Sequence, residues 1–179
     1  MTIGLSARFA KVRPAALIAV VVAISVYQLF GFLGLRINTS PSLPVGLYVV
    51  TTDGSADLVE FCPTEPFATL SLIRGYRDSG SCRDGGAPLL KPIVATAGDT
   101  VEVSGRGIYV NGLLLPNTAP LSKDTKGRPL DPWHFGRFPV SLGTVWVASS
   151  YHPRSFDSRY FGPVYTTTIR HRLRAFLTL

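Results

Sequence analysis

The stretch Asn38-Thr39-Ser40-Pro41-Ser42-Leu43-Pro44-Val45-Gly46-Leu47-Tyr48 places two serines among prolines, shortly after the long apolar run of the chain ends. Proline fixes φ and favours an extended conformation in the residue before it. We therefore expect Ser40 and Leu43 to be extended and Ser42 to lie on a stiff, exposed turn, which is how a nucleophilic hydroxyl has to be presented. The same composition also occurs in ordinary loops, so this stretch alone leaves both interpretations open.

The apolar run lies immediately upstream of this stretch. Residues 14–35 carry no charge, and a membrane helix needs roughly 20 apolar residues to cross about 30 Å of hydrocarbon. We predict a transmembrane anchor at 14–35. The alternative is a cleaved signal peptide, but such peptides have an apolar region of about 7–15 residues that ends at a small-residue cleavage site. The end of this run, Phe30-Gly31-Phe32-Leu33-Gly34-Leu35, makes a poor cleavage site.

Basic residues before the run predict its orientation. Arg8, Lys11 and Arg13 precede it, and positively charged flanks stay in the cytoplasm. Residues 1–13 are then a cytoplasmic tail, and residues 36–179 form a domain in the periplasm, attached to the bacterial inner membrane.

The net charge of the chain is +7. Such a charge favours either nucleic acid or an anionic membrane surface as a partner. The basic residues of the exported part are scattered and form no stripe interleaved with aromatic residues. We therefore expect contact with the membrane surface and none with nucleic acid.

The two cysteines of the chain, Cys62 and Cys82, both lie in the exported part. The bacterial periplasm is oxidising, which favours a disulfide between them. The alternative is a pair of unrelated buried thiols.

Short β-rich runs divided by Gly, Asn and Pro turns predict the fold of residues 36–179. The strongest hairpin signal is Asn111-Gly112. This pattern predicts one compact, mainly β domain, a sandwich or a barrel. A short helix is expected at 66–74 and a long mobile loop at 116–139. The expected strands are 47–51, 58–61, 89–96, 100–104, 108–110, 113–115, 145–148 and 164–169.

A single lysine, Lys91, interrupts the apolar run Pro88-Leu89-Leu90-Lys91-Pro92-Ile93-Val94-Ala95-Thr96-Ala97-Gly98-Asp99-Thr100. Burial of an ammonium is costly, so the pKa of a buried lysine falls from about 10.4 towards neutrality. A neutral lysine can act as the general base that activates a serine. The alternative is a strand lysine whose ammonium extends to solvent.

A third segment, Ser149-Ser150-Tyr151-His152-Pro153-Arg154-Ser155-Phe156-Asp157-Ser158-Arg159, carries several polar side chains. If it is extended, Ser155, Asp157 and Arg159 share one face, because side chains alternate along a strand. Asp157 and Arg159 are then placed to form an ion pair, and Ser155 to contact a lysine. The alternative is a polar surface loop.

Together, the apolar run and these three segments resemble the bacterial type I signal (leader) peptidases, over nearly the whole chain and in the same order. Within that superfamily, the chain is most similar to the peptidases of conjugative transfer. The features that carry this closer resemblance are the stretch 38–48, Arg74-Gly75-Tyr76 followed by Ser81-Cys82, and Pro88-Leu89-Leu90-Lys91.

The resemblance implies a role for each matching residue. Ser42 matches the nucleophile and Lys91 the general base. Ser40 matches the side chain that helps to line the oxyanion hole, with the backbone N–H of Ser42 as the second donor. Ser155 matches the serine that orients the lysine, and the supporting pair is Asp157 and Arg159.

The chain departs from the leader peptidases at several points. Leu43 stands where they usually have methionine, a swap of nearly equal volume. Residues 149–152 differ from the opening of the corresponding leader peptidase motif, and the resemblance assigns them no role. The large inserted second domain of some leader peptidases is also missing, so we expect one compact catalytic domain.

The three histidines, His134, His152 and His171, show neither triad nor metal-ligand spacing, and we expect no metal and no other cofactor. The resemblance implies a membrane-anchored Ser-Lys endopeptidase. Its expected substrate is an exported precursor, specifically the pilin of a conjugation apparatus, with head-to-tail cyclisation of the product as one outcome. Other proteins of that apparatus are expected partners. The alternatives are a general type I signal peptidase and a non-catalytic scaffold of a secretion complex.

Overall fold

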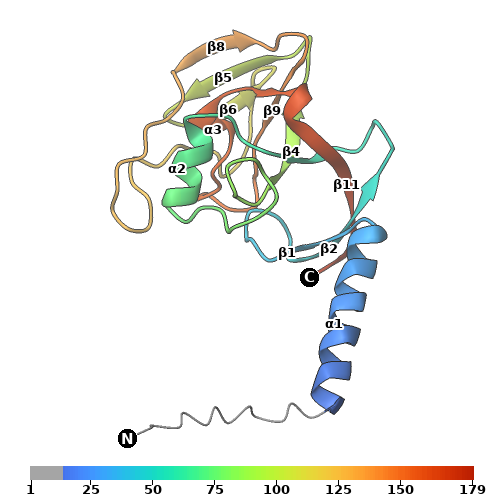
Figure 1. Cartoon of the computed structure of the whole chain (residues 1–179). Coiled ribbons are helices and arrows are strands. Elements are labelled where there is room, and N and C mark those ends of the chain that lie inside the picture. Colours follow the sequence, from blue (N-terminus) through green and yellow to red (C-terminus); the bar gives the residue numbers. More distant parts are fainter. Residues whose placement is uncertain (1–13) are drawn as a thin grey trace, which may run out of the picture.

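The computed structural model describes residues 14–179. Helix α1 (Pro14–Phe32) extends away from the rest of the chain (Figure 1). Its 19 residues carry no charge, and its large apolar side chains, such as Leu17 and Val21, are exposed. Of the helices within residues 14–179, none combines the length and the apolarity that crossing a membrane requires. The segment 14–35 is thus helical over most of its length, and its role as an anchor stays a prediction. The predicted tail 1–13 lies outside the described residues.

The rest of the chain is mainly β, as predicted, and contains two antiparallel sheets. The larger sheet has seven strands in the order β1-β2-β11-β3-β4-β9-β10. Their bounds are Leu35–Asn38 (β1), Gly46–Thr51 (β2), Ile169–Thr178 (β11), Leu58–Phe61 (β3), Leu89–Ala95 (β4), Thr144–Val147 (β9) and Val164–Tyr165 (β10).

The smaller sheet has four strands in the order β7-β6-β5-β8 and lies at the end of the domain farthest from α1 (Figure 1). Its strands are Leu113–Leu114 (β7), Gly107–Val110 (β6), Thr100–Ser104 (β5) and Gly136–Pro139 (β8). Two short helices complete the domain, α2 (Phe67–Ile73) and α3 (Ser158–Phe161). The two sheets are connected by the turn between β4 and β5, where Gly98 has a positive φ of 99°, a conformation that glycine adopts without steric cost.

Strand β4 places Lys91 in the interior of the larger sheet. The strand pairs with β3 on one side, where Lys91 lies opposite Val59, and with β9 on the other. Leu89, Lys91 and Ala95 are buried, so the lysine occupies a position that strand alternation otherwise gives to apolar side chains. The sequence alternative of an ammonium that extends to solvent is therefore wrong.

The apolar core consists of three groups of side chains. The largest, around Val59, Phe61 and Phe161, fills the space between the larger sheet and helices α2 and α3. The second, around Val103 and Trp146, lies under the smaller sheet. The third contains Leu43, Tyr48 and Leu173, and it anchors the residue that follows Ser42.

Most predicted strands are present with boundaries that differ by one residue or none. Three strands were missed, β1, β8 and β11, and the predicted strand 164–169 is wrong as a continuous element. Its middle is a turn of 3-10 helix, Thr166–Thr168, which separates β10 from β11. The predicted loop 116–139 contains β8, and side-chain hydrogen bonds fasten it to the domain, for example from the backbone N–H of Leu121 to the Tyr160 hydroxyl at 3.0 Å.

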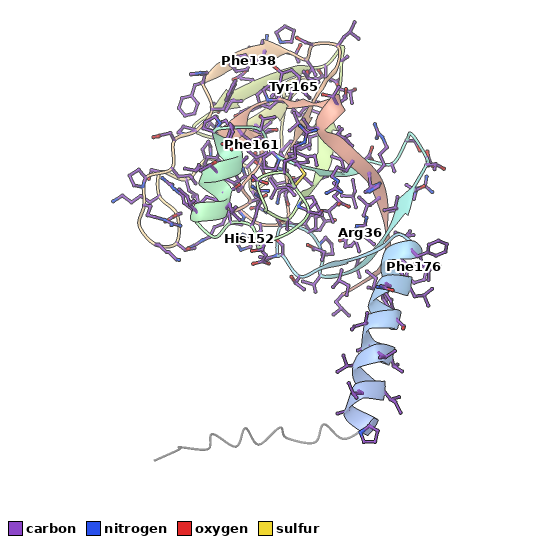
Figure 2. The ribbon with its side chains drawn as sticks, in the orientation of Figure 1. Arg36, Phe138, His152, Phe161, Tyr165 and Phe176 are labelled. Atoms are coloured by element: carbon purple, nitrogen blue, oxygen red, sulfur yellow. A yellow bond between two sulfur atoms is a disulfide. The ribbon has the colours of Figure 1, made fainter. Side chains whose placement is uncertain are left out.

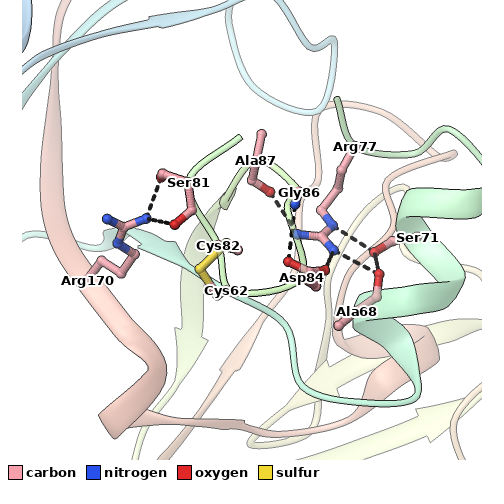
Figure 3. The surroundings of a disulfide bond; sticks show 10 residues. All are labelled: Cys62, Ala68, Ser71, Arg77, Ser81, Cys82, Asp84, Gly86, Ala87 and Arg170. Atoms are coloured by element: carbon pink, nitrogen blue, oxygen red, sulfur yellow. Dashed lines mark hydrogen bonds and ion pairs between the residues drawn. A yellow bond between two sulfur atoms is a disulfide. The ribbon is translucent and has the colours of Figure 1, made fainter. Parts of the chain in front are cut away.

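The predicted disulfide is present and ties the end of β3 to the loop before β4 (Figure 3). Cys62 and Cys82 are bonded, with Cα atoms 5.8 Å apart. Inside the same loop, the buried guanidinium of Arg77 forms an ion pair with Asp84 and donates to the Ser71 hydroxyl at 2.8 Å. The bond and the guanidinium together fix the segment that leads into β4.

We predict that replacing both cysteines by serine lowers the free energy of unfolding by about 3 kcal/mol, because the bond closes a loop with a sequence separation of 20 residues. Urea unfolding of the purified full-length chain, followed by tryptophan fluorescence, measures this change. Wild-type protein treated with reductant should unfold at the same urea concentration as the double variant. Equal stability of the oxidised wild type and the double variant would contradict the prediction.

Candidate active site

The turn between β1 and β2, residues 39–45, is held mainly by side chains. The Asn38 amide nitrogen lies 3.0, 3.2 and 3.1 Å from the carbonyl oxygens of Ser40, Leu43 and Pro44. Its oxygen accepts a hydrogen bond from the backbone N–H of Ser40 at 3.2 Å. Asn38 is itself buried. Asn38 lies in the stretch 38–48, but no sequence pattern indicates this function.

Ser42 lies on this turn, next to Lys91. The Lys91 ammonium donates to Ser42 Oγ at 2.7 Å, a contact that joins residues 49 positions apart. Both residues are buried, with 6% of Ser42 and 4% of Lys91 exposed. The predicted exposed turn is present, since residues 39–41 are exposed. Ser42 itself is buried, in contact with Lys91 of β4 and with Ser149 after β9.

The buried position changes the acidity of Lys91. Burial lowers the pKa of Lys91 from 10.5 to about 8, since water no longer solvates the ammonium. The Asp157 carboxylate raises this pKa and the Arg159 guanidinium lowers it. A substantial fraction of Lys91 is therefore neutral near physiological pH, and a neutral amine can accept a proton from a hydroxyl 2.7 Å away.

Ser40 stands beside the two polar groups of Ser42. Its hydroxyl oxygen lies 2.9 Å from Ser42 Oγ and accepts from the Ser42 backbone N–H at 3.3 Å. The backbone N–H of Ser42 and the Ser40 hydroxyl, the two predicted oxyanion donors, thus contact each other beside the nucleophilic oxygen. The structure brings Ser40, Ser42 and Lys91 together.

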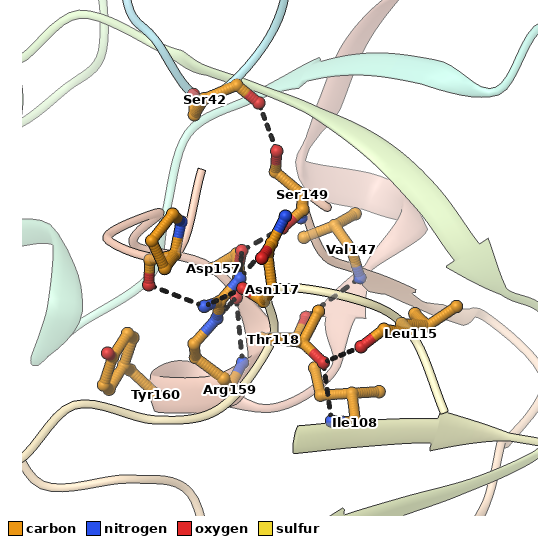
Figure 4. Close-up of polar contacts among 12 residues, drawn as sticks. Ser42, Ile108, Leu115, Asn117, Thr118, Val147, Ser149, Asp157, Arg159 and Tyr160 are labelled. Carbon is orange, nitrogen blue, oxygen red and sulfur yellow. Dashed lines mark hydrogen bonds and ion pairs between the residues drawn. The ribbon is translucent and has the colours of Figure 1, made fainter. Parts of the chain in front are cut away.

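Asp157 and Arg159 form a fully buried ion pair (Figure 4). Arg159 Nε donates to one carboxylate oxygen at 2.8 Å and Arg159 Nη2 to the other at 3.0 Å. The guanidinium also donates to the backbone carbonyls of Asn117, Pro153 and Ser149. The pair was predicted, but the extended segment was not observed. Arg159 lies in helix α3, and Asp157 caps that helix by accepting from the Arg159 backbone N–H.

Ser155 lies on the same cleft as Lys91 but does not bond to it. Its side chain is 3% exposed, and its hydroxyl has no hydrogen-bond partner among the described residues. The predicted orienting role of Ser155 therefore stays a prediction.

Sequence reasoning missed Ser149, which is fully buried. Its hydroxyl donates to the backbone carbonyl of Ser42, and its backbone N–H donates to Asp157 at 3.0 Å. The contact with Ser42 spans 107 positions of sequence. No pattern of residue types in the sequence predicts such a contact between two serines.

A cleft of about 740 Å³ opens beside Ser42 and Lys91. It is large enough for an extended peptide segment, and part of its wall is apolar, with Leu89, Leu90 and Phe156. His152 also lines it, and its Nδ1 accepts from the backbone N–H of Arg154. His134 packs on Trp133 and His171 lies in β11. In residues 14–179, no group of three or more His, Cys, Asp or Glu side chains is placed to hold a metal ion.

A buried serine and lysine at the edge of a peptide-sized cleft define a candidate serine peptidase site. The family model described as signal peptidase, peptidase S26, matches residues 7–177, so the chain belongs to the S26 family of signal peptidases. Its relatives include proteins of conjugal transfer, as the resemblance implied.

Plasmid transfer protein TraF of Escherichia coli is 35% identical over 152 residues, which cover 81% of this chain and 83% of that protein. The probable conjugal transfer protein TraF of Sinorhizobium fredii is 41% identical over 138 residues, covering 74% and 71%. Conjugal transfer protein TraF of Agrobacterium fabrum is 37% identical over 136 residues, covering 73% and 75%. In the solved signal peptidase I of Enterococcus faecalis V583, the match covers 70% of this chain and 99% of that one, at 21% identity and a TM-score of 0.38.

We predict that acylation of Ser42 accelerates as pH rises through about 8, because only neutral Lys91 can accept the proton. The release of p-nitrophenol from a peptidyl p-nitrophenyl ester, measured between pH 6 and 10, should follow one ionisation with its midpoint near 8. Ser42→Ala provides the background rate at each pH. A Lys91→Arg variant should lack the enzymatic burst throughout, since a guanidinium does not deprotonate in this range. A burst of constant rate across the range would contradict the prediction.

We also predict that Asn38→Asp slows acylation by about 10- to 100-fold and lowers the free energy of unfolding by about 1–3 kcal/mol. The change keeps the size of the side chain but replaces its N–H donors with an oxygen that faces three carbonyl groups. The matched control is Asn117→Asp, at an exposed asparagine whose amide donates to a single carbonyl, that of Ser150. Equal effects of the two substitutions would show that the hydrogen bonds of Asn38 do not hold the turn in its active geometry.

Proposed function

We propose that this chain is a Ser-Lys endopeptidase in which Ser42 is the nucleophile and Lys91 the general base. The observation that carries the proposal is the 2.7 Å contact between Ser42 Oγ and the buried Lys91 Nζ. A surface lysine stays charged at neutral pH and cannot accept a proton. Burial makes the neutral form accessible, which is what activation of a serine requires.

The proposed reaction begins with a peptide in the cleft. Neutral Lys91 accepts the Ser42 hydroxyl proton while Ser42 Oγ attacks the scissile carbonyl carbon. Negative charge develops on the carbonyl oxygen, where the Ser42 backbone N–H and the Ser40 hydroxyl are the proposed donors. Each donor of this kind is worth about 3–4 kcal/mol of barrier in serine peptidases. Lys91 then gives its proton to the leaving amine, and an ester on Ser42 remains.

Asp157 and Arg159 are the proposed support of this step. The carboxylate and the guanidinium shift the pKa of Lys91 in opposite directions, and burial is the largest cause of the observed lowering. The carboxylate stabilises the ammonium that forms during attack. The guanidinium destabilises the same ammonium, so Lys91 can release the proton again. Ser155, which has an unpartnered hydroxyl on the same cleft, is the proposed group that orients Lys91.

The proposed location is the bacterial inner membrane, with residues 36–179 in the periplasm. Supporting features are the uncharged α1 and the exposed apolar residues Phe176, Leu177 and Leu179 at the end of β11. Figure 2 shows Phe176 on the side of the domain from which α1 extends. The short connection from Arg36 to Ser42 spans at most about 20 Å when extended, which keeps the nucleophile near the membrane surface.

The proposed substrate is an exported precursor, specifically the pilin of a conjugation apparatus, since relatives of the chain are plasmid and conjugal transfer proteins. The acyl-enzyme has two fates. Water gives a trimmed linear pilin, whereas attack by the pilin's own N-terminal amine gives a cyclic one. The amine must compete with about 55 M water, and held intramolecular nucleophiles reach effective molarities well above that.

We predict that cells with the pilin gene and this chain produce a trimmed pilin, whereas cells with Ser42→Ala or Lys91→Arg accumulate the precursor. Intact-mass spectrometry measures the products and also distinguishes the two fates, because the cyclic pilin is one water lighter than the linear one. A membrane-fraction immunoblot checks that the variants are present in equal amounts. Trimming that continues in both variants would contradict the Ser-Lys assignment, and trimming of unrelated secreted proteins alone would favour a general signal peptidase.

A further inference from the structure

Ser149 connects the nucleophile to the buried ion pair. It follows β9 by two residues and is fully buried between the β1–β2 turn and the Asp157–Arg159 pair (Figure 4). We propose that Ser149 is a positioning residue for the acylation step: its hydroxyl fixes the main chain of Ser42 so that Ser42 Oγ faces Lys91. This inference rests on the proposed function of Ser42 as the nucleophile.

Both backbone groups of Ser149 are held by the ion pair. Its N–H donates to Asp157 Oδ2 at 3.0 Å, and its carbonyl accepts from Arg159 Nη2 at 3.0 Å. A residue bonded on both sides by side chains that are themselves fully buried has little freedom to rotate. The ion pair therefore fixes the position of the Ser149 backbone, from which the side chain extends.

The hydroxyl of Ser149 has one direction in which it can donate. The backbone N–H of Tyr151 donates to its oxygen at 3.1 Å, which occupies a lone pair and leaves the single hydroxyl proton for another acceptor. That acceptor is the backbone carbonyl oxygen of Ser42. In this contact, the Ser149 hydroxyl is therefore the donor and the Ser42 carbonyl oxygen is the acceptor.

This contact completes the set of bonds that holds Ser42. The backbone N–H of Ser42 is bonded to Ser40, its side chain to Lys91, and its carbonyl to Ser149. Asn38 binds the carbonyls of the neighbouring residues of the turn. Rotation of the peptide after Ser42 would change its ψ and displace both Oγ and the N–H, and a displacement of about 1 Å can cost on the order of 100-fold in rate.

Asp157 and Arg159 then act on the site in two ways. One is electrostatic, through the ionisation of Lys91. The other is geometric, through Ser149 and the main chain of Ser42. Loss of the Ser149 hydroxyl removes the geometric route and leaves the charges in place, so it should change the rate of acylation without changing its pH dependence.

The test compares Ser149→Ala with Ser158→Ala. Ser158 is also a fully buried serine, and its hydroxyl accepts a hydrogen bond from a backbone group, the N–H of Val147. The full-length proteins are mixed with a peptidyl p-nitrophenyl ester, and the burst gives the maximal acylation rate, the half-saturating ester concentration and the pH midpoint. Melting temperatures of all variants are measured in the same buffer.

For Ser149→Ala we expect a maximal acylation rate about 10- to 100-fold below wild type, a half-saturating concentration within about twofold and an unchanged pH midpoint. Ser158→Ala should keep the wild-type rate even where its melting temperature falls. Ser149→Cys, which fills the space but is a weak donor, should give an intermediate rate, and it replaces Ser149→Ala as the test if the alanine variant does not fold.

Three results would overturn the inference: a wild-type rate in Ser149→Ala or Ser149→Cys, equal losses in Ser149→Ala and Ser158→Ala, or a shifted pH midpoint, which would place the effect on Lys91 ionisation. Ser42→Ala tests the underlying function separately. If Ser42→Ala retains the burst, the proposed nucleophile is wrong, whereas a silent Ser42→Ala together with a fully active Ser149→Ala refutes the role of Ser149 alone.

Discussion

An amine buried inside a β-sheet is the constraint on which the rest of the domain depends. Lys91 lies in β4 between β3 and β9, where an apolar side chain would pack more favourably. The desolvation cost of its charged form is what brings its pKa to about 8. Neighbouring groups must then supply polar contacts to Lys91 without holding it in the charged ammonium form. The β1–β2 turn supplies one such contact through the Ser42 hydroxyl.

The β1–β2 turn shows how a short loop can be rigid without a regular backbone ladder. Pro41 and Pro44 fix φ but have no N–H to donate, so carbonyl groups of the turn must find donors elsewhere. Side chains provide them: Asn38 from β1, Ser149 from the segment after β9, and the Tyr48 hydroxyl, which donates to the carbonyl of Pro44 at 2.7 Å. Because these donors come from separate elements, the position of Ser42 depends on the assembly of the whole sheet.

Local patterns in the sequence predicted much of the fold and less of the site. Alternation and turn residues located strands such as β3 and β5, and compartment chemistry predicted the Cys62–Cys82 bond. Strand β11 does follow a period-two pattern, with Arg170, Arg172 and Arg174 on one face. It was missed because its high charge and its exposed last residues are typical of a surface segment. Its place between β2 and β3 is a tertiary property that no local window contains.

The pairing of Ser42 with Lys91 came from the resemblance to leader peptidases, since 49 residues separate them and spacing alone carries no such information. The roles of Asn38 and Ser149 were beyond both kinds of reasoning. Each of these side chains bonds to backbone carbonyl groups. Every residue has such a group, so the residue type does not identify the partner. Such contacts are defined only by the three-dimensional path of the loop.

The arrangement around Asp157 explains how a carboxylate can lie near a buried amine without forming a direct hydrogen bond to it. One oxygen accepts from Arg159 Nε and from the Arg159 backbone N–H, and the other accepts from Arg159 Nη2 and from the Ser149 backbone N–H. The lone pairs of a carboxylate bonded in this way are already occupied. A direct bond to Lys91 would stabilise the ammonium and keep it from acting as a base. Because Arg159 and Ser149 hold the carboxylate instead, Asp157 acts on Lys91 through its field while the hydrogen-bonding position of the amine stays directed at Ser42.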